Sequence, residues 1–173
     1  QRDRSAGLKI LAFSHYPNEI AGTVNRVHNW KPLMEELGHS FDIVDAPGLE
    51  RFVHLYENGN KIQRYYFVSK ILLARYFHVL RTFQYDIIFI HRGLYPYYPK
   101  MDWTFPRLER LLHAINPRTI VDFYDADYVL DEEYIIKTIR FARHISTVNT
   151  YLKDYFSRHH SSVSIMPLML DPS

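Results

Sequence analysis

Short apolar runs alternate with longer amphipathic patterns along almost the whole chain, and this alternation constrains the fold most strongly. The short runs predict buried strands, and patterns with a period of three to four residues predict helices that cover them. The predicted strands lie at 8–14, 41–44, 86–91, the run that begins at Thr119, 144–148 and 163–166. The predicted helices lie at about 24–37, 61–83, 103–114, 132–143 and 150–159.

Strands that alternate with helices favour right-handed crossover connections. Such connections make the strands parallel and put helices on both faces of the sheet. We therefore expect an α/β fold, a three-layer α/β/α Rossmann-like domain with a parallel sheet of about six or seven strands. The chain has 173 residues, of which 47% are apolar and 23% are charged. This composition suits one compact domain with its own core, so residues 1–173 are expected to form a single domain.

Charge and cysteine content narrow the classes of function. The formal net charge is only +2, with 21 basic and 19 acidic residues, so no nucleic-acid partner is predicted. The absence of cysteine excludes disulfides, thiol catalysis and thiolate metal sites, and it fits an intracellular protein. No apolar stretch approaches the roughly 20 residues that span a bilayer. We expect a cytoplasmic protein, and peripheral contact with the inner face of the membrane is the alternative that stays open.

Three acids, Asp122, Asp125 and Asp127, lie at the end of the run that begins at Thr119. Open parallel sheets bind ligands beyond the carboxyl ends of their strands, so these acids fall at the functional edge. One of them can act as a general base or accept a hydrogen bond from a hydroxyl. The alternative is that all three cap the next helix. Two carboxylates at i and i+2 point to opposite sides, and no third ligand lies near, so no metal site is predicted.

Two further loops are expected to open on the same edge. Gly22 and Thr23 precede a helix, where free N–H groups favour a phosphate or a carboxylate. The alternative is a simple turn with Thr23 as the N-cap. His91 and Arg92 end the run at 86–91, and an arginine suits bidentate binding of phosphate or carboxylate. The alternative is an arginine paired with a nearby acid, and the residues alone leave both questions open.

The long helical pattern at 61–83 has two distinct sides. One side predicts a buried face made of Tyr65, Val68, Leu72, Tyr76, Val79 and Phe83. The other side interleaves Arg64, Lys70, Arg75, His78 and Arg81 with Phe67, Ile71 and Phe77. Basic and aromatic residues on one face suit an anionic membrane surface. A solvated face with snorkelling stems explains the same residues.

Three groups of segments follow one another in a characteristic order. The first comprises 9–14, Gly22, Arg26 and the helix end from Leu33 to Gly38-His39. The second comprises 86–92, Tyr95-Pro96, Glu109, Leu112, 121–123 and 125–126. The third comprises 144–148, Tyr151, Leu152, Tyr155, 163–167 and Asp171. In order and spacing they resemble the N-terminal domain of a retaining glycosyltransferase of the GT-B fold, family 4-like, over nearly the whole chain.

The resemblance implies the acceptor-side half of a nucleotide-sugar-dependent enzyme of carbohydrate biosynthesis, which transfers a sugar to a hydroxyl of a glycan or lipid-linked acceptor. Asp125, with Tyr124, would orient that hydroxyl as the catalytic residues. The candidate substrate-binding residues are Gly22, Thr23, Arg26, His91, Arg92, Asp122 and Asp127. The nucleotide-sugar donor would be held largely by a C-terminal domain, which is expected to be absent from this chain. The chain alone is therefore expected to be inactive, and no cofactor is implied.

The chain departs from the family pattern at three places. Tyr124 stands where the subgroup usually has Asp or other members have His, and Ala21-Gly22 replaces the common paired glycines. The segment 167–171 lacks the family's Asn and Gly. Two alternatives to a transferase stay open: a non-catalytic α/β module that binds a ligand or regulates, and a nucleotide-sugar epimerase of the same fold.

Overall fold

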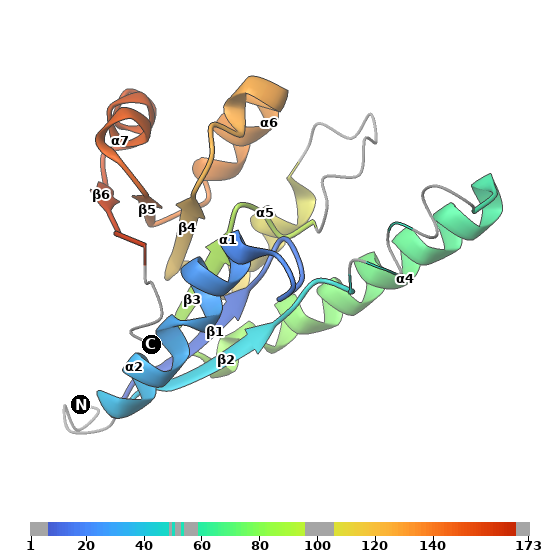
Figure 1. Ribbon diagram of the computed structural model, residues 1–173, viewed down its shortest axis with the longest axis horizontal. Helices are drawn as coiled ribbons and strands as arrows, with labels where there is room; N and C mark the ends of the chain where they lie inside the picture. Colours follow the sequence, from blue (N-terminus) through green and yellow to red (C-terminus); the bar gives the residue numbers. More distant parts are fainter. Residues whose placement is uncertain (1–6, 49, 51–52, 54–58, 96–105, 169–173) are drawn as a thin grey trace.

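The computed structural model describes residues 7–48, 50, 53, 59–95 and 106–168. Its centre is a six-stranded sheet of parallel strands in the order β2-β1-β3-β4-β5-β6 (Figure 1). The strands are β1 (Lys9–Phe13), β2 (Ser40–Val44), β3 (Ile87–His91), β4 (Thr119–Phe123), β5 (His144–Thr147) and β6 (Val163–Ile165). The predicted α/β fold with a parallel sheet is confirmed, and the strand number is the lower of the two expected values.

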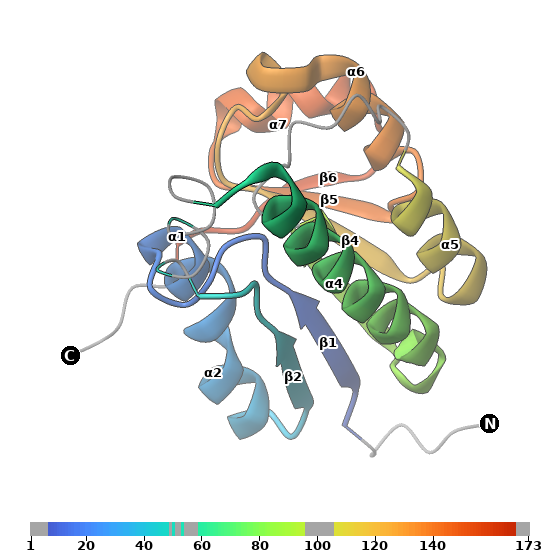
Figure 2. The same ribbon diagram turned by 90° about the vertical axis from the view of Figure 1, so that its right-hand side faces the viewer.

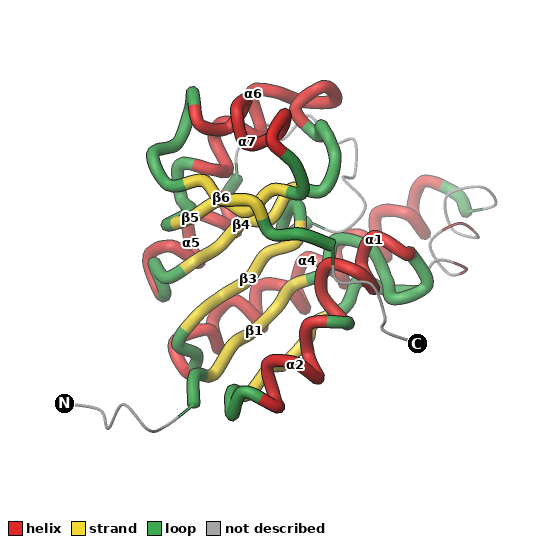
Figure 3. Tube along the Cα trace, turned by 60° about the vertical axis from the view of Figure 1, so that its left-hand side comes forward, coloured by secondary structure: helices red, strands yellow, loops and turns green. Residues whose placement is uncertain are grey.

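Helices cover both faces of this sheet. They are α1 (Ala21–Thr23), the π-helix η1 (Val24–His28), α2 (Trp30–Glu36), α4 (Lys61–Leu80), the 3₁₀ helix η2 (Arg81–Gln84), α5 (Arg107–Ile115), α6 (Tyr128–Ile139) and α7 (Thr150–Ser157). The helices α1 and α2 lie on one side of the sheet, and α4 lies on the other (Figures 2 and 3). The predicted three-layer arrangement is therefore present. The first residues of the helix predicted at 103–114 lie outside the described residues.

The side chains of the central strands alternate between two cores. Leu11 and Phe13 of β1 belong to a large core with residues of α4, α5, α6 and α7. Ile10 and Ala12, their neighbours in sequence, belong to a smaller core with residues of η1 and β2. A strand that is buried on both faces reads as a continuous apolar run, which is why these strands were recognisable in the sequence.

The range predicted as one helix, 24–37, is helical but divided, because the π-helix η1 and the α-helix α2 share it directly after α1. The N–H of Asn29 donates to the carbonyl of Val24 (2.9 Å), a bond with the five-residue spacing of a π-turn. The extra residue turns both Arg26 and Val27 into the interior. The last piece ends before Gly38, whose φ of 81° is the left-handed conformation that glycine adopts at helix ends.

The buried face of α4 also differs from the prediction. Tyr65, Tyr76 and Phe83 are exposed, whereas Phe67 and Arg75 are buried. Arg75 is buried because its guanidinium donates to the carbonyls of Ser14 (2.8 Å) and Val44 (3.1 Å), at the carboxyl ends of β1 and β2. Burial lowers the pKa of Arg75 to about 10.

The strand register places three polar side chains side by side near the carboxyl edge. His91 of β3 is paired with Asp122 of β4, which is paired with Ser146 of β5. Residues paired across parallel strands present their side chains on the same face of the sheet. All three are buried, on the face that carries η1. A buried layer of polar side chains therefore lies within the sheet, next to the edge where the candidate site is found.

Candidate functional site at the carboxyl edge of the sheet

The guanidinium of Arg92 joins the loops that follow β3 and β4. Its Nε donates to Oδ2 of Asp127 (2.9 Å), and its Nη1 donates to Oδ2 of Asp125 (3.1 Å). Its Nη2 donates to the second oxygen of Asp127. The same guanidinium lies 5.1 Å from the ring centroid of Tyr16, within the range of a cation–π contact. The pairing of Arg92 with nearby acids, left open by the sequence, is therefore present.

The backbone of Arg92 has a φ of 68°, the one positive value among the described residues other than glycine. A side-chain-bearing residue held in this region costs about 1–3 kcal/mol and persists where its surroundings impose it. Here the N–H of Arg92 donates to the carbonyl of Asp122 (2.8 Å), and the side chain is fixed by two carboxylates. Such strain concentrates at functional sites, so Arg92 marks this loop as a candidate.

The two carboxylates that hold Arg92 differ in their exposure. The side chain of Asp127 is 1% exposed and that of Asp125 is 53% exposed. Asp127 occupies the N-cap position of α6, but its side chain accepts no capping hydrogen bond. Burial raises the pKa of Asp127, which the hydrogen bonds and charge of Arg92 oppose. Asp127 thus anchors Arg92, while Asp125 keeps an oxygen available to solvent or to a ligand.

Arg26 and Asp122 form an ion pair in the interior. Both side chains are fully buried, and Nε of Arg26 donates to Oδ2 of Asp122 (2.9 Å). Ser146 donates to the other carboxylate oxygen, and Nη1 of Arg26 donates to the carbonyls of Met166 and Pro167. Burial raises the pKa of the Asp122 carboxyl, against the charge of Arg26. The pair ties η1 to β4 and to the segment after β6.

Two buried imidazoles, those of His15 and His91, lie close enough to Arg92 to be affected by its charge. His91 is 1% exposed, and neither of its ring nitrogens has a hydrogen-bond partner among the described residues. Burial, with the charges of Arg92 and Arg26, lowers the pKa of His91 to about 3. His15, directly after β1, is fully buried, and burial with the charge of Arg92 lowers its pKa well below the usual value. Burial therefore favours the uncharged form of both rings.

Gly22 of α1 lies against Tyr124, which belongs to the loop after β4. A Cβ added to Gly22 would lie 3.8 Å from Cδ1 and from Cε1 of the Tyr124 ring, so the glycine backbone lies next to that ring. Thr23 is buried, and its hydroxyl donates to the carbonyl of Tyr16 (3.2 Å). Thr23 occupies the N-cap position of η1, but its side chain makes no capping hydrogen bond there, and the N-cap of α1 is Ile20.

The predicted site residues thus separate into two layers. One layer contains Gly22 from α1, Arg92 from the loop after β3, and Tyr124 and Asp125 from the loop after β4, with Asp125 the exposed carboxylate. Arg26 and Asp122 are fully buried beneath them, so the structure gives this pair a supporting position. No group of three potential metal-ligating side chains occurs in the part of the chain that the structure describes.

Sequence reasoning missed His15, Tyr16 and Ser146. Tyr16 supplies the aromatic face under Arg92, His15 adds a buried imidazole, and Ser146 holds Asp122. The first two follow β1 directly, so their position at a strand end was the available signal. Ser146 had no such signal, because it lies within β5 and its contact with β4 depends on strand order.

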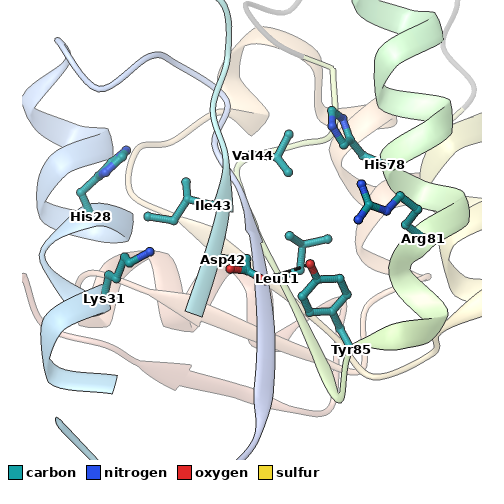
Figure 4. A pocket seen from close by; sticks show the side chains of 9 residues that line it. All are labelled: Leu11, His28, Lys31, Asp42, Ile43, Val44, His78, Arg81 and Tyr85. Carbon is teal, nitrogen blue, oxygen red and sulfur yellow. Dashed lines mark hydrogen bonds between the residues drawn. The ribbon is translucent and has the colours of Figure 1, made fainter. Parts of the chain in front are cut away.

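A separate groove lies at the β2 edge of the sheet, and its lining side chains stand on both sides of β2 (Figure 4). It has a volume of about 480 Å³, and the hydroxyl of Tyr85 donates to Asp42 inside it (2.9 Å). Its lining residues are Leu11, His28, Lys31, Asp42, Ile43, Val44, His78, Arg81 and Tyr85. None of the residues predicted from the sequence to bind substrate lines this groove.

Comparison with known proteins does not identify the chain. No family model matches the sequence, and no curated protein matches it. Among the described residues, no helix is both long and apolar enough to cross a membrane.

Proposed function

We propose that the chain is the acceptor-binding N-terminal half of a nucleotide-sugar-dependent glycosyltransferase that transfers a sugar to a hydroxyl. The observation that carries the proposal is the Asp125 carboxylate, which is half-exposed, held by Arg92 and adjacent in sequence to Tyr124 beside Gly22. The order and spacing of the segments that resemble the GT-B family support it. The parallel sheet, whose carboxyl edge collects these residues, supports it as well.

In the proposed reaction, Asp125 accepts a hydrogen bond from the acceptor hydroxyl and increases its nucleophilicity as the sugar is transferred. Tyr124 contributes a second polar group beside the same hydroxyl. Arg92 acts through Asp125 and is a positioning residue, because it fixes the carboxylate at 3.1 Å from its Nη1. Gly22, next to the Tyr124 ring, would face the acceptor or the donor phosphates.

The donor would be bound mainly outside these 173 residues, by the second domain that the family resemblance implies. The acceptor is a glycan or a lipid-linked hydroxyl in this proposal, and the enzyme belongs to carbohydrate biosynthesis. We place it in the cytoplasm, in keeping with a sequence that contains no cysteine. No cofactor is required for the proposed transfer.

Product analysis separates the proposed transferase from its alternatives. The protein that carries this chain is incubated with a panel of nucleotide sugars, with and without hydroxyl acceptors, and the products are identified by mass spectrometry. We expect a glycosylated acceptor and a free nucleoside diphosphate, and we expect the 173-residue chain alone to form neither. An epimerised nucleotide sugar formed without acceptor would indicate the epimerase instead. No conversion of any donor would favour the non-catalytic module.

A further inference from the structure

The outward side of α4 carries a mostly apolar stripe, which we call the α4 outer stripe. It consists of Ile62, Tyr65, Tyr66, Leu73, Tyr76, Phe77, Leu80 and Phe83, the last from η2. At 100° per residue these positions fall within one sector of the helix, opposite the side that contains the buried Val68 and Arg75. Residues spaced by three, four and seven positions lie along one helix face, and the exposed Ser69 lies in the same sector, between Tyr66 and Leu73.

The stripe is strongly exposed to solvent. Ile62 is 79% exposed, Tyr66 is 71% exposed and Phe77 is 61% exposed. Single exposed apolar residues are ordinary on a protein surface, but a contiguous apolar patch usually marks an interaction site. In Figure 1 the first turns of α4 extend beyond the strands, so this part of the helix is accessible from outside.

The charges around the stripe have one sign. Residues 61–84 contain five Lys and Arg residues and no Asp or Glu. Arg75 is buried, whereas Lys61, Lys70 and Arg81 are exposed. Around the helix, Lys70 and Arg81 lie along one border of the stripe and Lys61 lies on the other. An apolar surface with cations at its borders is the arrangement of helices that lie in the interface of an anionic bilayer.

We propose that the α4 outer stripe docks the protein on an anionic lipid bilayer surface, with α4 lying in the interface. The apolar and aromatic side chains would enter the boundary between headgroups and acyl chains, and the bordering cations would contact lipid phosphates. Charge argues against a second copy of this chain as the occupant. Pairing two such helices would bring two acid-free, cationic segments together.

This surface differs from the membrane-binding face predicted from the sequence. Phe67 and Arg75, which that prediction placed against lipid, are buried under the sheet. Tyr65, Tyr76 and Phe83, which were predicted to be buried, belong to the exposed stripe. The proposal therefore rests on the observed orientation of α4, and it is independent of the proposed glycosyl transfer.

Vesicle co-sedimentation tests the proposal without any substrate. The chain is mixed with vesicles of phosphatidylcholine alone or with added phosphatidylglycerol, at low and high salt. We expect binding to the anionic vesicles that high salt weakens. The double variant Leu73→Ser/Phe77→Ser should weaken vesicle binding by roughly tenfold or more, because two inserted side chains are lost. Val129→Ser/Leu130→Ser on α6, at equally exposed apolar positions, is the matched control and should bind as the unchanged chain does.

The charge contribution has its own matched pair of variants. Lys70→Glu/Arg81→Glu should weaken binding to anionic vesicles by roughly tenfold or more, since each basic residue near such a surface adds attraction. Arg140→Glu/Arg158→Glu, which makes the same change of charge just after α6 and just after α7, should bind more tightly than Lys70→Glu/Arg81→Glu. Circular dichroism checks that each variant is folded.

Three results would overturn the docking surface. The first is negligible binding of the unchanged chain to every vesicle. The second is equal loss of binding in the stripe variants and their controls. The third is a concentration-dependent dimer, measured by light scattering, that Leu73→Ser/Phe77→Ser abolishes while lipid binding is absent; that result would assign the stripe to a contact between copies.

Discussion

Replacing Asp122 by asparagine is expected to lower the free energy of unfolding by about 3–5 kcal/mol. The substitution keeps the shape of the side chain but leaves the Arg26 guanidinium buried without its counter-charge. Both side chains are fully buried, so water cannot take the place of the lost carboxylate. The change would also remove an ionic partner from the contact that joins η1 and β4. Urea unfolding followed by far-ultraviolet circular dichroism measures the difference.

Two variants make this result interpretable. Asp125→Asn removes a carboxylate that is 53% exposed, and it should change stability by less than about 1 kcal/mol. The double variant Arg26→Met/Asp122→Asn should be more stable than the sum of the single variants predicts, because it removes both charges together. A loss of less than about 1 kcal/mol for Asp122→Asn would contradict the supporting role of the pair.

Asp125→Asn is expected to lower turnover by more than roughly tenfold in the protein that carries this chain. An amide keeps the size of the carboxylate. It is a far weaker base, and it accepts a weaker hydrogen bond from the hydroxyl that receives the sugar. Because the same substitution should leave the fold intact, the loss would appear in kcat rather than in the yield of folded protein. Steady-state kinetics with the donor and acceptor identified by product analysis provide the measurement.

Arg92→Lys tests, in the same assay, whether Arg92 acts by positioning the Asp125 carboxylate. The guanidinium fork contacts Asp125 and Asp127 together, and a lysine ammonium cannot reproduce that geometry. Activity should fall, and Arg92→Lys combined with Asp125→Asn should add little to the loss from Asp125→Asn alone. Near-normal turnover of Asp125→Asn, with turnover abolished by Tyr124→Phe, would reverse the roles proposed for these two residues.

The sheet could be predicted because its strands are buried on both faces. Such strands leave an apolar run in the sequence that does not depend on the choice of neighbours, as for 86–91 and the run at Thr119. The parallel topology then followed from the alternation with helices. The boundaries were accurate to one or two residues for most strands. The element α6 begins at Tyr128 and is kinked at the non-helical Asp131, so the helix predicted from about residue 132 is the part of α6 after that kink.

The orientation of α4 could not be predicted because both of its sides are apolar and aromatic. A period of 3.6 residues identifies a helix, but it selects the buried side only when the opposite side is polar. Here the choice depends on Arg75, whose long side chain finds two strand-end carbonyls. A buried arginine of this kind depends on tertiary contacts that a pattern of single residues does not contain.

The position of the candidate site could be predicted from the sequence, but the burial of its individual side chains could not. The strand-end rule located Arg92 and the three acids, because all four lie at or just beyond the end of a buried strand. It could not distinguish Asp122, which lies within β4 and is buried, from Asp125, which lies beyond the strand and is half-exposed. The difference arises from strand pairing with Ser146 and from the π-turn that brings Arg26 inward.

The central claim is that the carboxyl edge around Asp125 binds the reacting hydroxyl, and amide chemical shifts test it most directly. The chain is labelled with nitrogen-15 and titrated with nucleotide sugars, methyl glycosides and short oligosaccharides. We predict saturable shifts of the amides of Gly22, Tyr124 and Asp125 with a hydroxyl ligand, and their loss in Asp125→Asn. Shifts confined to the groove at β2, around Lys31 and Tyr85, would contradict the account, as would no response to any of these ligands.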